Sequence, residues 1–323
     1  MKAIAYSTYG PPEVLRYEEV EKPEIGDDEV LIKVHAAAVN PLDWHFMRGL
    51  PYFLRVATGL HRPNAPLGVD AAGTVEAIGE NVTQFNYGDE VFGACRGAFA
   101  EYARAHASTL AIKPGNITFE QAACLNVAGL TALQGLRDKG QVRPAEKVLI
   151  NGAAGGVGTL AIQIAKWLGA DVTGVCSASN VDLVRSIGAD RVIDYANENF
   201  TLGSERYDLI FDCIGNHPLS ALRRVLNPKG RYLAVGGPTG DWMLGFLARG
   251  IAGAAMSIFG RQKLSIVTVK RSQQDLVLLG ELIQTGKIRP IIDRRCGLKD
   301  VPEAIRYVEQ GHARGKVVIA MGS

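Results

Sequence analysis

The sequence has few of the features that mark secreted, metal-binding or nucleic-acid-binding proteins. Its 323 residues include only five cysteines, Cys95, Cys124, Cys176, Cys213 and Cys296, and no two of them form a Cys-x-x-Cys pair. An odd, scattered set of this kind indicates reduced thiols, not a disulfide framework or a zinc knuckle. The 35 basic and 33 acidic residues are interspersed along the chain. Because no basic block stands out, the charge pattern argues against nucleic acid as a partner.

Signals for secretion and membrane insertion are also sparse. The N-terminus runs directly into the alternating segment Lys2–Tyr6, without the basic and apolar regions of a secretory signal, so we expect a cytoplasmic protein. The mostly apolar residues 242–259 approach the length of a short membrane span, but Arg249 and glycines interrupt them. We interpret this segment as buried and partly helical, lining a pocket or a subunit interface. Contact with a membrane surface is the alternative.

Two kinds of pattern divide the chain near residue 120. Before it, short β-branched runs such as Val30–Val34 and Gly73–Ile78 are separated by glycine and proline turns, which indicates a β-rich domain. After it, short apolar runs alternate with helical periodicity, as in βαβ units on a parallel sheet. These runs predict six strands, which are Lys147–Asn151, Asp171–Cys176, Asp190–Asp194, Tyr207–Asp212, Arg231–Val235 and Leu264–Val269.

The C-terminal residues predict a helix (Asp275–Ile283), a strand-like run (Ile288–Ile292), a second helix (Val301–Val308) and a final strand (Lys316–Ala320). They have too little apolar mass for a domain of their own, so we expect them to complete the N-terminal domain. The predicted fold class is therefore α/β, with a Rossmann domain of residues 123–269 inserted into a β-rich domain of residues 1–122 and 270–323. The Rossmann domain would hold a doubly wound, parallel, six-stranded sheet.

A glycine-rich turn follows the first predicted strand of the central domain. It reads Ala153-x-Gly155-x-x-Gly158 and leads into a helix whose apolar face includes Leu160 and Ile164. Small residues at this place let the backbone turn tightly and approach a pyrophosphate at the helix N-terminus, as in dinucleotide-binding folds. Glycines also serve packing alone, but the order strand, turn and helix favours the dinucleotide. No Gly-Lys-Ser/Thr follows, which excludes a P-loop.

The residues after the second predicted strand of this domain bear on the choice of dinucleotide. NAD sites place a carboxylate about 20 residues past the glycines, where it binds the ribose 2′-hydroxyl. Here the segment contains Ser177, Ser179 and Asn180, and Asp182 falls inside the next predicted helix. Hydroxyl and amide groups would meet a 2′-phosphate without like-charge repulsion, which favours NADPH. The same side chains could also cap the following helix, and the two roles are compatible.

Several catalytic arrangements are missing from the sequence. None of the six histidines is followed by Glu, no tyrosine begins a Tyr-x-x-x-Lys pair, and no Gly-x-Ser-x-Gly occurs. Without a Lewis acid, the protein is poorly equipped to stabilise a developing alkoxide. Quinones and α,β-unsaturated carbonyls stabilise an incoming hydride through their own conjugation, so they are the consistent acceptors.

These motifs together resemble the medium-chain dehydrogenase/reductase superfamily, in its zinc-free quinone oxidoreductase branch. The resemblance covers essentially the whole chain, and Val69-Asp70 stands where zinc-binding relatives carry His-Glu. It implies a GroES-like substrate domain beside the Rossmann domain, NADPH in the cleft, and a homodimer formed through the edge strand of the nucleotide domain. The segments that carry it are Ala37–Asp43, Pro66–Val75, Ala128–Ala132, the glycine turn, Val192–Tyr195, Phe211–Gly215 and Gly315–Val318.

The resemblance also implies site residues. It places Asn40 near the nicotinamide, and Tyr52 where relatives often have an active-site tyrosine, although Leu50–Leu54 departs from their usual pattern. Asn40 and Tyr52 are therefore the candidate catalytic residues. The implied cofactor-binding residues are Asn40, Thr131, Ala154, Gly155, Gly156, Val157, Ser177, Ser179, Asn180, Tyr195, Ile214, Val235 and Lys316.

Other roles remain open for the polar residues of the N-terminal domain. Asn40 precedes a proline and could be a turn residue, and Tyr52 could serve packing alone. Asp43 and Asp70 are better explained as buried hydrogen-bond anchors than as acids, and water could supply the proton. The sequence therefore predicts an NADPH-dependent reductase of quinones or enones. The alternative is an NADPH-binding regulatory or scaffold protein with little turnover.

Overall fold

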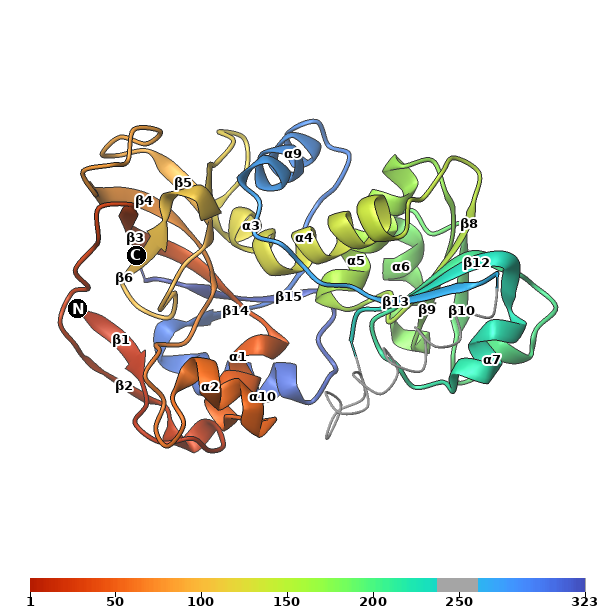
Figure 1. The fold of residues 1–323 in the computed structure, drawn as a ribbon, viewed down its shortest axis with the longest axis horizontal. Coiled ribbons are helices and arrows are strands. Elements are labelled where there is room, and N and C mark those ends of the chain that lie inside the picture. The colour runs from red at the N-terminus through yellow and green to blue at the C-terminus, as the bar shows by residue number, and fades with distance from the viewer. Residues whose placement is uncertain (237–260, 323) are drawn as a thin grey trace. The chain divides into compact units, whose positions relative to one another are not determined.

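The computed structural model describes residues 1–236 and 261–322. The chain divides into two compact units, which Figure 1 shows in the colours of the sequence. The boundaries predicted from the sequence come after residues 122 and 269. The apolar segment 242–259 lies outside the described residues. Unit 1 comprises Met1–Val127, Arg271–Gly286 and Pro290–Ser323, and unit 2 comprises Ala128–Lys270 and Lys287–Arg289.

A seven-stranded sheet forms the framework of unit 1. Its strands follow the order β14-β15-β3-β4-β5-β7, and β6 also pairs with β3. The hairpin of β1 (Lys2–Ala5) and β2 (Arg16–Glu19) forms a separate two-stranded sheet. The sheet strands are β3 (Glu29–Val39), β4 (Asp70–Ile78), β5 (Glu90–Ala94), β6 (Tyr102–His106), β7 (Leu110–Ile112), β14 (Ile292–Gly297) and β15 (Lys316–Ala320).

The long strand β3 is the centre of this sheet. Its first half pairs with β6 and its second half, Ala36–Val39, pairs with β15, while β4 runs along most of it. The C-terminal strand β15 therefore completes the N-terminal sheet, since its only pairings among the described residues are to β14 and β3. The helices of unit 1 are α1 (Pro41–Arg48), α2 (Arg55–Thr58), α3 (Phe119–Ala123), α9 (Gln273–Gln284) and α10 (Val301–Glu309), and the 3-10 turn η2 covers Tyr52–Leu54.

The strand predicted at Ile288–Ile292 is wrong in its position. Strand β14 begins only at Ile292 and continues to Gly297. Pro290 lies in the predicted run, and proline cannot donate the backbone hydrogen bond that a strand interior requires. The other C-terminal elements lie where the sequence predicts them, with β15 covering Lys316–Ala320.

Unit 2 contains a parallel six-stranded sheet with the strand order β10-β9-β8-β11-β12-β13. One core cluster includes a residue from each strand, so a whole face of the sheet is buried. This order reverses between β8 and β11, which is the doubly wound arrangement of the Rossmann fold. The strands are β8 (Lys147–Asn151), β9 (Asp171–Cys176), β10 (Arg191–Asp194), β11 (Tyr207–Asp212), β12 (Leu226–Ala234) and β13 (Lys263–Ile266).

Helix α5 (Gly156–Trp167) carries the apolar face predicted from the sequence. Leu160, Ala161, Ile164 and Ala165 are all buried in it. Within residues 1–236 and 261–322, every helix is too short or too polar to cross a bilayer. The other helices are α4 (Asn126–Gln134), which begins at the boundary of the units, α6 (Val181–Ser186) and α7 (Leu219–Arg224).

Candidate active site and cofactor-binding site

The turn between β8 and α5 is closed so tightly that two of its glycines have no substitute. Gly152 has a φ of +82°, in the left-handed region that favours glycine. A Cβ atom on Gly158 would lie 2.1 Å from the carbonyl oxygen of Gly152. The helix can therefore start directly against the turn, with its first N–H groups at the carboxyl end of the sheet.

Gly155 is different, because the protein itself does not require a glycine there. It is the N-cap of α5 with an ordinary φ of −78°. The nearest atom to a Cβ built on it is the Gly152 carbonyl oxygen, at 3.5 Å. A side chain at this position would fill the space in front of the α5 N-terminus, where Gly156 and Val157 begin the helix. This open space, which we call the cradle, lies beside the first N–H groups of α5 and fits a pyrophosphate.

The cradle lies at the reversal point of the strand order, where dinucleotides bind in such sheets. A Cβ atom on Gly152 would approach the Cδ1 atom of Ile214 to 2.8 Å, so the ends of β8 and β11 meet there. Ile214 keeps 40% of its surface exposed, as a groove-lining side chain would. The backbone N–H of Val235 donates to the backbone carbonyl of Asp212 at 2.9 Å, which places Val235 at the same edge of the sheet.

Asp212 holds these strand ends together, although it was not among the site residues predicted from the sequence. It is fully buried, and it accepts hydrogen bonds from Asn151 at 2.8 Å, from the Gly215 N–H at 2.8 Å and from the Tyr232 hydroxyl at 3.0 Å. It also accepts one from the Ile214 N–H at 3.1 Å. An acidic residue directly after the apolar run Leu209–Phe211 is the signal that could have identified it.

The predicted adenosine-end residues lie together after β9. Asn180 donates from Nδ2 to Ser177 Oγ at 3.0 Å, and the Ser177 and Ser179 hydroxyls are 3.2 Å apart. The Oδ1 atom of Asn180 is buried and lacks a hydrogen-bond partner. A buried polar atom without a partner is costly, and a ligand hydroxyl or amine would satisfy it. Tyr195, which is 63% exposed, follows the neighbouring strand β10.

Of two carboxylates near this segment, one is exposed and the other accepts hydrogen bonds from its neighbours in the chain. The Asp182 side chain is fully exposed on α6, and Asp194 accepts from the Ala196 N–H and from Asn197 Nδ2. The polar groups gathered after β9 are therefore two hydroxyls and an amide. Thr131 and Ala154, also predicted as cofactor residues, are buried in unit 2, on α4 and in the glycine turn.

In unit 1, Asn40 is the centre of a buried polar network. It caps α1, and its backbone N–H donates to Asp43 at 2.7 Å. Its Oδ1 atom lies 2.5 Å from the Lys316 ammonium, and its Nδ2 donates to Asp70 at 3.0 Å and to the Ala38 carbonyl at 3.1 Å. Asn40 is thus a helix-cap residue by its backbone and a network residue by its side chain.

Asp70 and Lys316 complete this network. Asp70 is fully buried and accepts from Asn126 Nδ2 at 2.8 Å and from the Val127 N–H at 3.1 Å. Lys316 is 4% exposed, and its ammonium lies 3.2 Å from the Val39 carbonyl and 3.4 Å from Asp70. Asp70 is therefore a hydrogen-bond anchor, as the sequence analysis favours.

Asp43 is a second buried anchor with an unusual proton affinity. It is fully buried, and its Oδ2 accepts a hydrogen bond from the backbone N–H of Asn40. Burial raises the pKa of this carboxyl from 3.8 to about 7, with the nearby charge of Asp70 acting in the same direction. Burial therefore favours the neutral form of this carboxyl.

Tyr52, the other candidate catalytic residue, lies on the surface of unit 1. It begins the turn η2, is 71% exposed, and has the Arg55 guanidinium 4.7 Å from its ring centre. Arg55 in turn donates to the Gly49 carbonyl at 3.0 Å and lies 4.4 Å from the Tyr9 ring centre. The phenol is therefore accessible, on a segment that Arg55 fastens to the rest of the unit.

Comparison with known proteins identifies the family. Residues 26–115 match the model of the alcohol dehydrogenase GroES-like domain, and residues 187–319 match that of a zinc-binding dehydrogenase. A 2-methylene-furan-3-one reductase of Solanum lycopersicum is 34% identical over 334 residues, covering 99% of this chain and 79% of its own. The chain belongs to the medium-chain dehydrogenase/reductase superfamily, in its quinone oxidoreductase branch. The resemblance read from the sequence is thereby confirmed.

Other members of the superfamily agree in sequence and fold. An NADPH-dependent alkenal/one oxidoreductase of Arabidopsis thaliana is also 34% identical, covering 99% of this chain and 79% of its own. The quinone oxidoreductase of Coxiella burnetii superimposes with a TM-score of 0.89 at 32% identity, covering 100% of this chain and 99% of its own. That of Escherichia coli, complexed with NADPH, gives 0.84 at 26% identity, covering 99% of this chain and 100% of its own. The predicted α/β fold with a GroES-like domain is confirmed.

The described residues offer no ready set of ligands for a catalytic zinc. Across residues 1–236 and 261–322, no three His, Cys, Asp or Glu side chains form a group that could hold a metal ion. Asp70 is occupied by its amide and ammonium partners.

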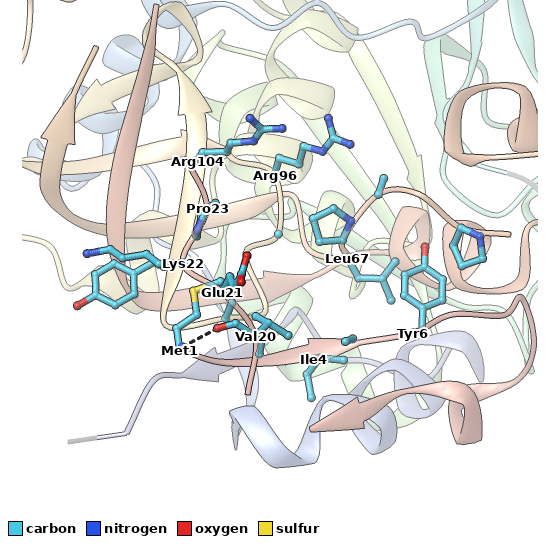
Figure 2. Close-up of a pocket in the computed structure, with 18 of the residues that line it drawn as sticks. Met1, Ile4, Tyr6, Val20, Glu21, Lys22, Pro23, Leu67, Arg96 and Arg104 are labelled. Atoms are coloured by element: carbon cyan, nitrogen blue, oxygen red, sulfur yellow. Dashed lines mark hydrogen bonds between the residues drawn. The ribbon is translucent and has the colours of Figure 1, made fainter. Parts of the chain in front are cut away.

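Unit 1 also has a hollow of about 700 Å³ on the side of β1 (Figure 2). Figure 2 shows Arg96 and Arg104 at one end of it and Ile4 and Val20 at the other. Tyr6 lines the hollow, and its hydroxyl is buried without a hydrogen-bond partner. The lining mixes basic and acidic side chains and includes none of the predicted site residues.

Proposed function

We propose that this protein is a zinc-independent, NADPH-dependent reductase that passes a hydride to a quinone or an α,β-unsaturated carbonyl. The observation that carries the proposal is the cradle at Gly155, which the protein leaves open in front of α5 although its own packing would accept a side chain. The names of the relatives, an alkenal/one oxidoreductase, a furanone reductase and quinone oxidoreductases, describe reduction of such acceptors.

Unit 2 supplies the proposed cofactor site. The α5 N-terminus and Gly155 would hold the pyrophosphate, with Thr131 and Ala154 near the phosphates. The cluster of Ser177, Ser179 and Asn180 would hold the 2′-phosphate and the adenosine ribose, next to Tyr195. Ile214 and Val235 would line the groove toward the nicotinamide, whose C4 supplies the hydride when NADPH is bound.

The acceptor class follows from what the chain does not offer. Its described residues include no set of metal ligands, and a developing alkoxide needs a strong electrophile beside it. In an enone the charge spreads over the conjugated carbonyl, and a proton from water or from the exposed phenol of Tyr52 completes the reduction. Asn40 is the other proposed contributor from unit 1.

A turnover assay tests this function. We expect NADPH absorbance to fall when a benzoquinone, a phenanthrenequinone or an enone is added, with little change for a simple aldehyde and no effect of a chelator. Tyr52→Phe should lower kcat several-fold if the phenol donates the proton, and leave it unchanged if water does. Tight NADPH binding without oxidation by any acceptor would favour the regulatory or scaffold alternative.

We also propose a cytoplasmic homodimer. Strand β13 (Lys263–Ile266) ends the sheet of unit 2, with β12 its only partner among the described strands, and such an edge can pair with a second copy. Light scattering on the purified protein would give twice the mass of the 34.6 kDa chain if this is right. Fractionation of the source cells tests the location.

A further inference from the structure

Lys316 is a buried lysine for which hydride transfer alone gives no reason. Its side chain is 5% exposed, and it lies opposite Asp70, which is fully buried. Sheet topology brings these residues together, because Lys316 begins β15, Asn40 follows β3, and Asp70 begins β4, and the three strands are neighbours in the order β15-β3-β4. Burying a charge is expensive, so a buried pair calls for a role.

We propose that Lys316 and Asp70 are positioning residues that hold the Asn40 side-chain amide in one orientation, so that Asn40 can only accept a hydrogen bond from a ligand. This inference rests on the proposed function. Asn40 Oδ1 lies 2.5 Å from the Lys316 ammonium, and its Nδ2 lies 3.0 Å from the Asp70 carboxylate. Turning the amide over would place NH₂ against an ammonium and oxygen against a carboxylate. The oxygen and the NH₂ group of an amide have nearly the same shape, so packing alone would allow either orientation. The charges of Lys316 and Asp70 therefore select one of them.

The hydrogen-bond capacity of the amide sets its ligand chemistry. Both Nδ2 protons are used, one by Asp70 and one by the Ala38 carbonyl at 3.1 Å. Oδ1 uses one lone pair for Lys316 and keeps one, so a group that binds Asn40 must bring a donor. The carboxamide NH₂ of a nicotinamide is such a donor, whereas the carbonyl oxygen of a quinone or enone is not. Under the proposed function, Asn40 would therefore suit the cofactor and not the acceptor.

Lys316 itself has no proton left for a cofactor phosphate. Its three ammonium protons match the three acceptors around it, which are the Val39 carbonyl at 3.2 Å, Asn40 Oδ1 and Asp70 Oδ2 at 3.4 Å. A contact of Lys316 with the cofactor would therefore be indirect, through Asn40.

A cofactor analogue without the NH₂ group gives the decisive comparison. The acetylpyridine analogue of NADPH replaces the carboxamide by a methyl ketone, and the parent protein should discriminate between the two by its ratio of kcat/KM. Asn40→Ala and Lys316→Met should each reduce that ratio by about 3- to 10-fold, the value of one hydrogen bond. Lys316→Arg, which keeps the charge, should restore part of it.

Lys113→Met is the matched control. Lys113 is also buried in unit 1, pairs with Glu90 at 2.8 Å and donates to the Ile117 carbonyl at 2.8 Å, so its loss carries a comparable cost in stability. Because it does not contact Asn40, the analogue ratio should stay as in the parent. An unchanged ratio in Asn40→Ala and Lys316→Met would overturn the inference, and so would an equal fall in Lys113→Met.

A second measurement does not depend on turnover. With selective ¹⁵N labelling of asparagine, the Nδ2 signal of Asn40, assigned by its loss in Asn40→Ala, should exchange slowly with solvent in the parent. In Asp70→Asn, which stays neutral and keeps the size of the side chain, it should shift and exchange at least about tenfold faster. Slow exchange in a parent that oxidises no NADPH would retain the locked amide and reject the reductase. Fast exchange in an active parent would reject the locked amide alone.

Discussion

At the scale of single residues, α1 holds two buried groups that burial drives toward their neutral forms. Asp43 has a pKa raised to about 7, and His45, which is 3% exposed, has a pKa lowered to about 4, both chiefly by desolvation. The consequences for stability have opposite signs. His45 lowers the free energy of unfolding as pH falls below 6.5, because the unfolded chain binds a proton that the native imidazole does not. Asp43 lowers it as pH rises, because the native carboxyl retains a proton that the unfolded chain releases near pH 3.8.

Asp43→Asn isolates the contribution of Asp43. The aspartate favours folding fully below pH 3.8, and that advantage disappears as pH rises through about 7. The free energy of unfolding of the parent, minus that of the variant, should therefore fall by about 2 to 3 kcal/mol between pH 5 and pH 8. Urea unfolding at the two pH values measures it. A difference that is independent of pH would show that Asp43 ionises normally.

Coenzyme preference is also argued at single residues. Ser177→Asp would place a carboxylate beside Ser179 and Asn180, where it can bind a ribose 2′-hydroxyl but repels a 2′-phosphate. We expect kcat/KM for NADPH to fall at least ~10-fold, with NADH unaffected or improved. Ser204→Asp, on an exposed loop of the same unit, adds the same charge as a control. An equal fall in kcat/KM with NADPH and NADH would show that these residues do not select the coenzyme.

At the scale of elements, two glycines of the turn before α5 have different roles: the fold requires Gly158, and the proposed ligand requires Gly155. Gly158→Ala sets a methyl group 2.1 Å from a carbonyl oxygen and should destabilise unit 2 by several kcal/mol. Gly155→Ala meets nothing closer than 3.5 Å and should cost about 1 kcal/mol or less, yet weaken NADPH binding at least ~10-fold. Thermal unfolding and fluorescence titration measure the two effects. Equal NADPH affinity of Gly155→Ala and the parent would contradict the proposal that the pyrophosphate binds in the cradle.

The elements also show what a sequence can and cannot predict. Strand β8, the glycine turn and α5 are adjacent in the chain, and their local patterns predicted them closely. The network of Asn40, Asp70 and Lys316 joins residues up to 276 positions apart, and only the strand order of the folded sheet makes them neighbours. Asp212 was missed in part for the same reason, since its partners Asn151 and Tyr232 lie on the neighbouring strands β8 and β12. The run at Ile288–Ile292 failed locally, because β-branched composition outweighed Pro290 in the prediction.

At the scale of the whole molecule, the central claim is that the chain transfers hydride from a nicotinamide to a conjugated acceptor. The most direct test uses NADPH deuterated at C4 in each stereochemical form, an open-chain enone and purified protein, with the product analysed by mass spectrometry and NMR. We predict that one of the two forms delivers a single deuterium to the β-carbon of the enone, while the α-carbon takes its proton from water, with or without a chelator. Product without deuterium from either form, or no product despite bound NADPH, would contradict the account.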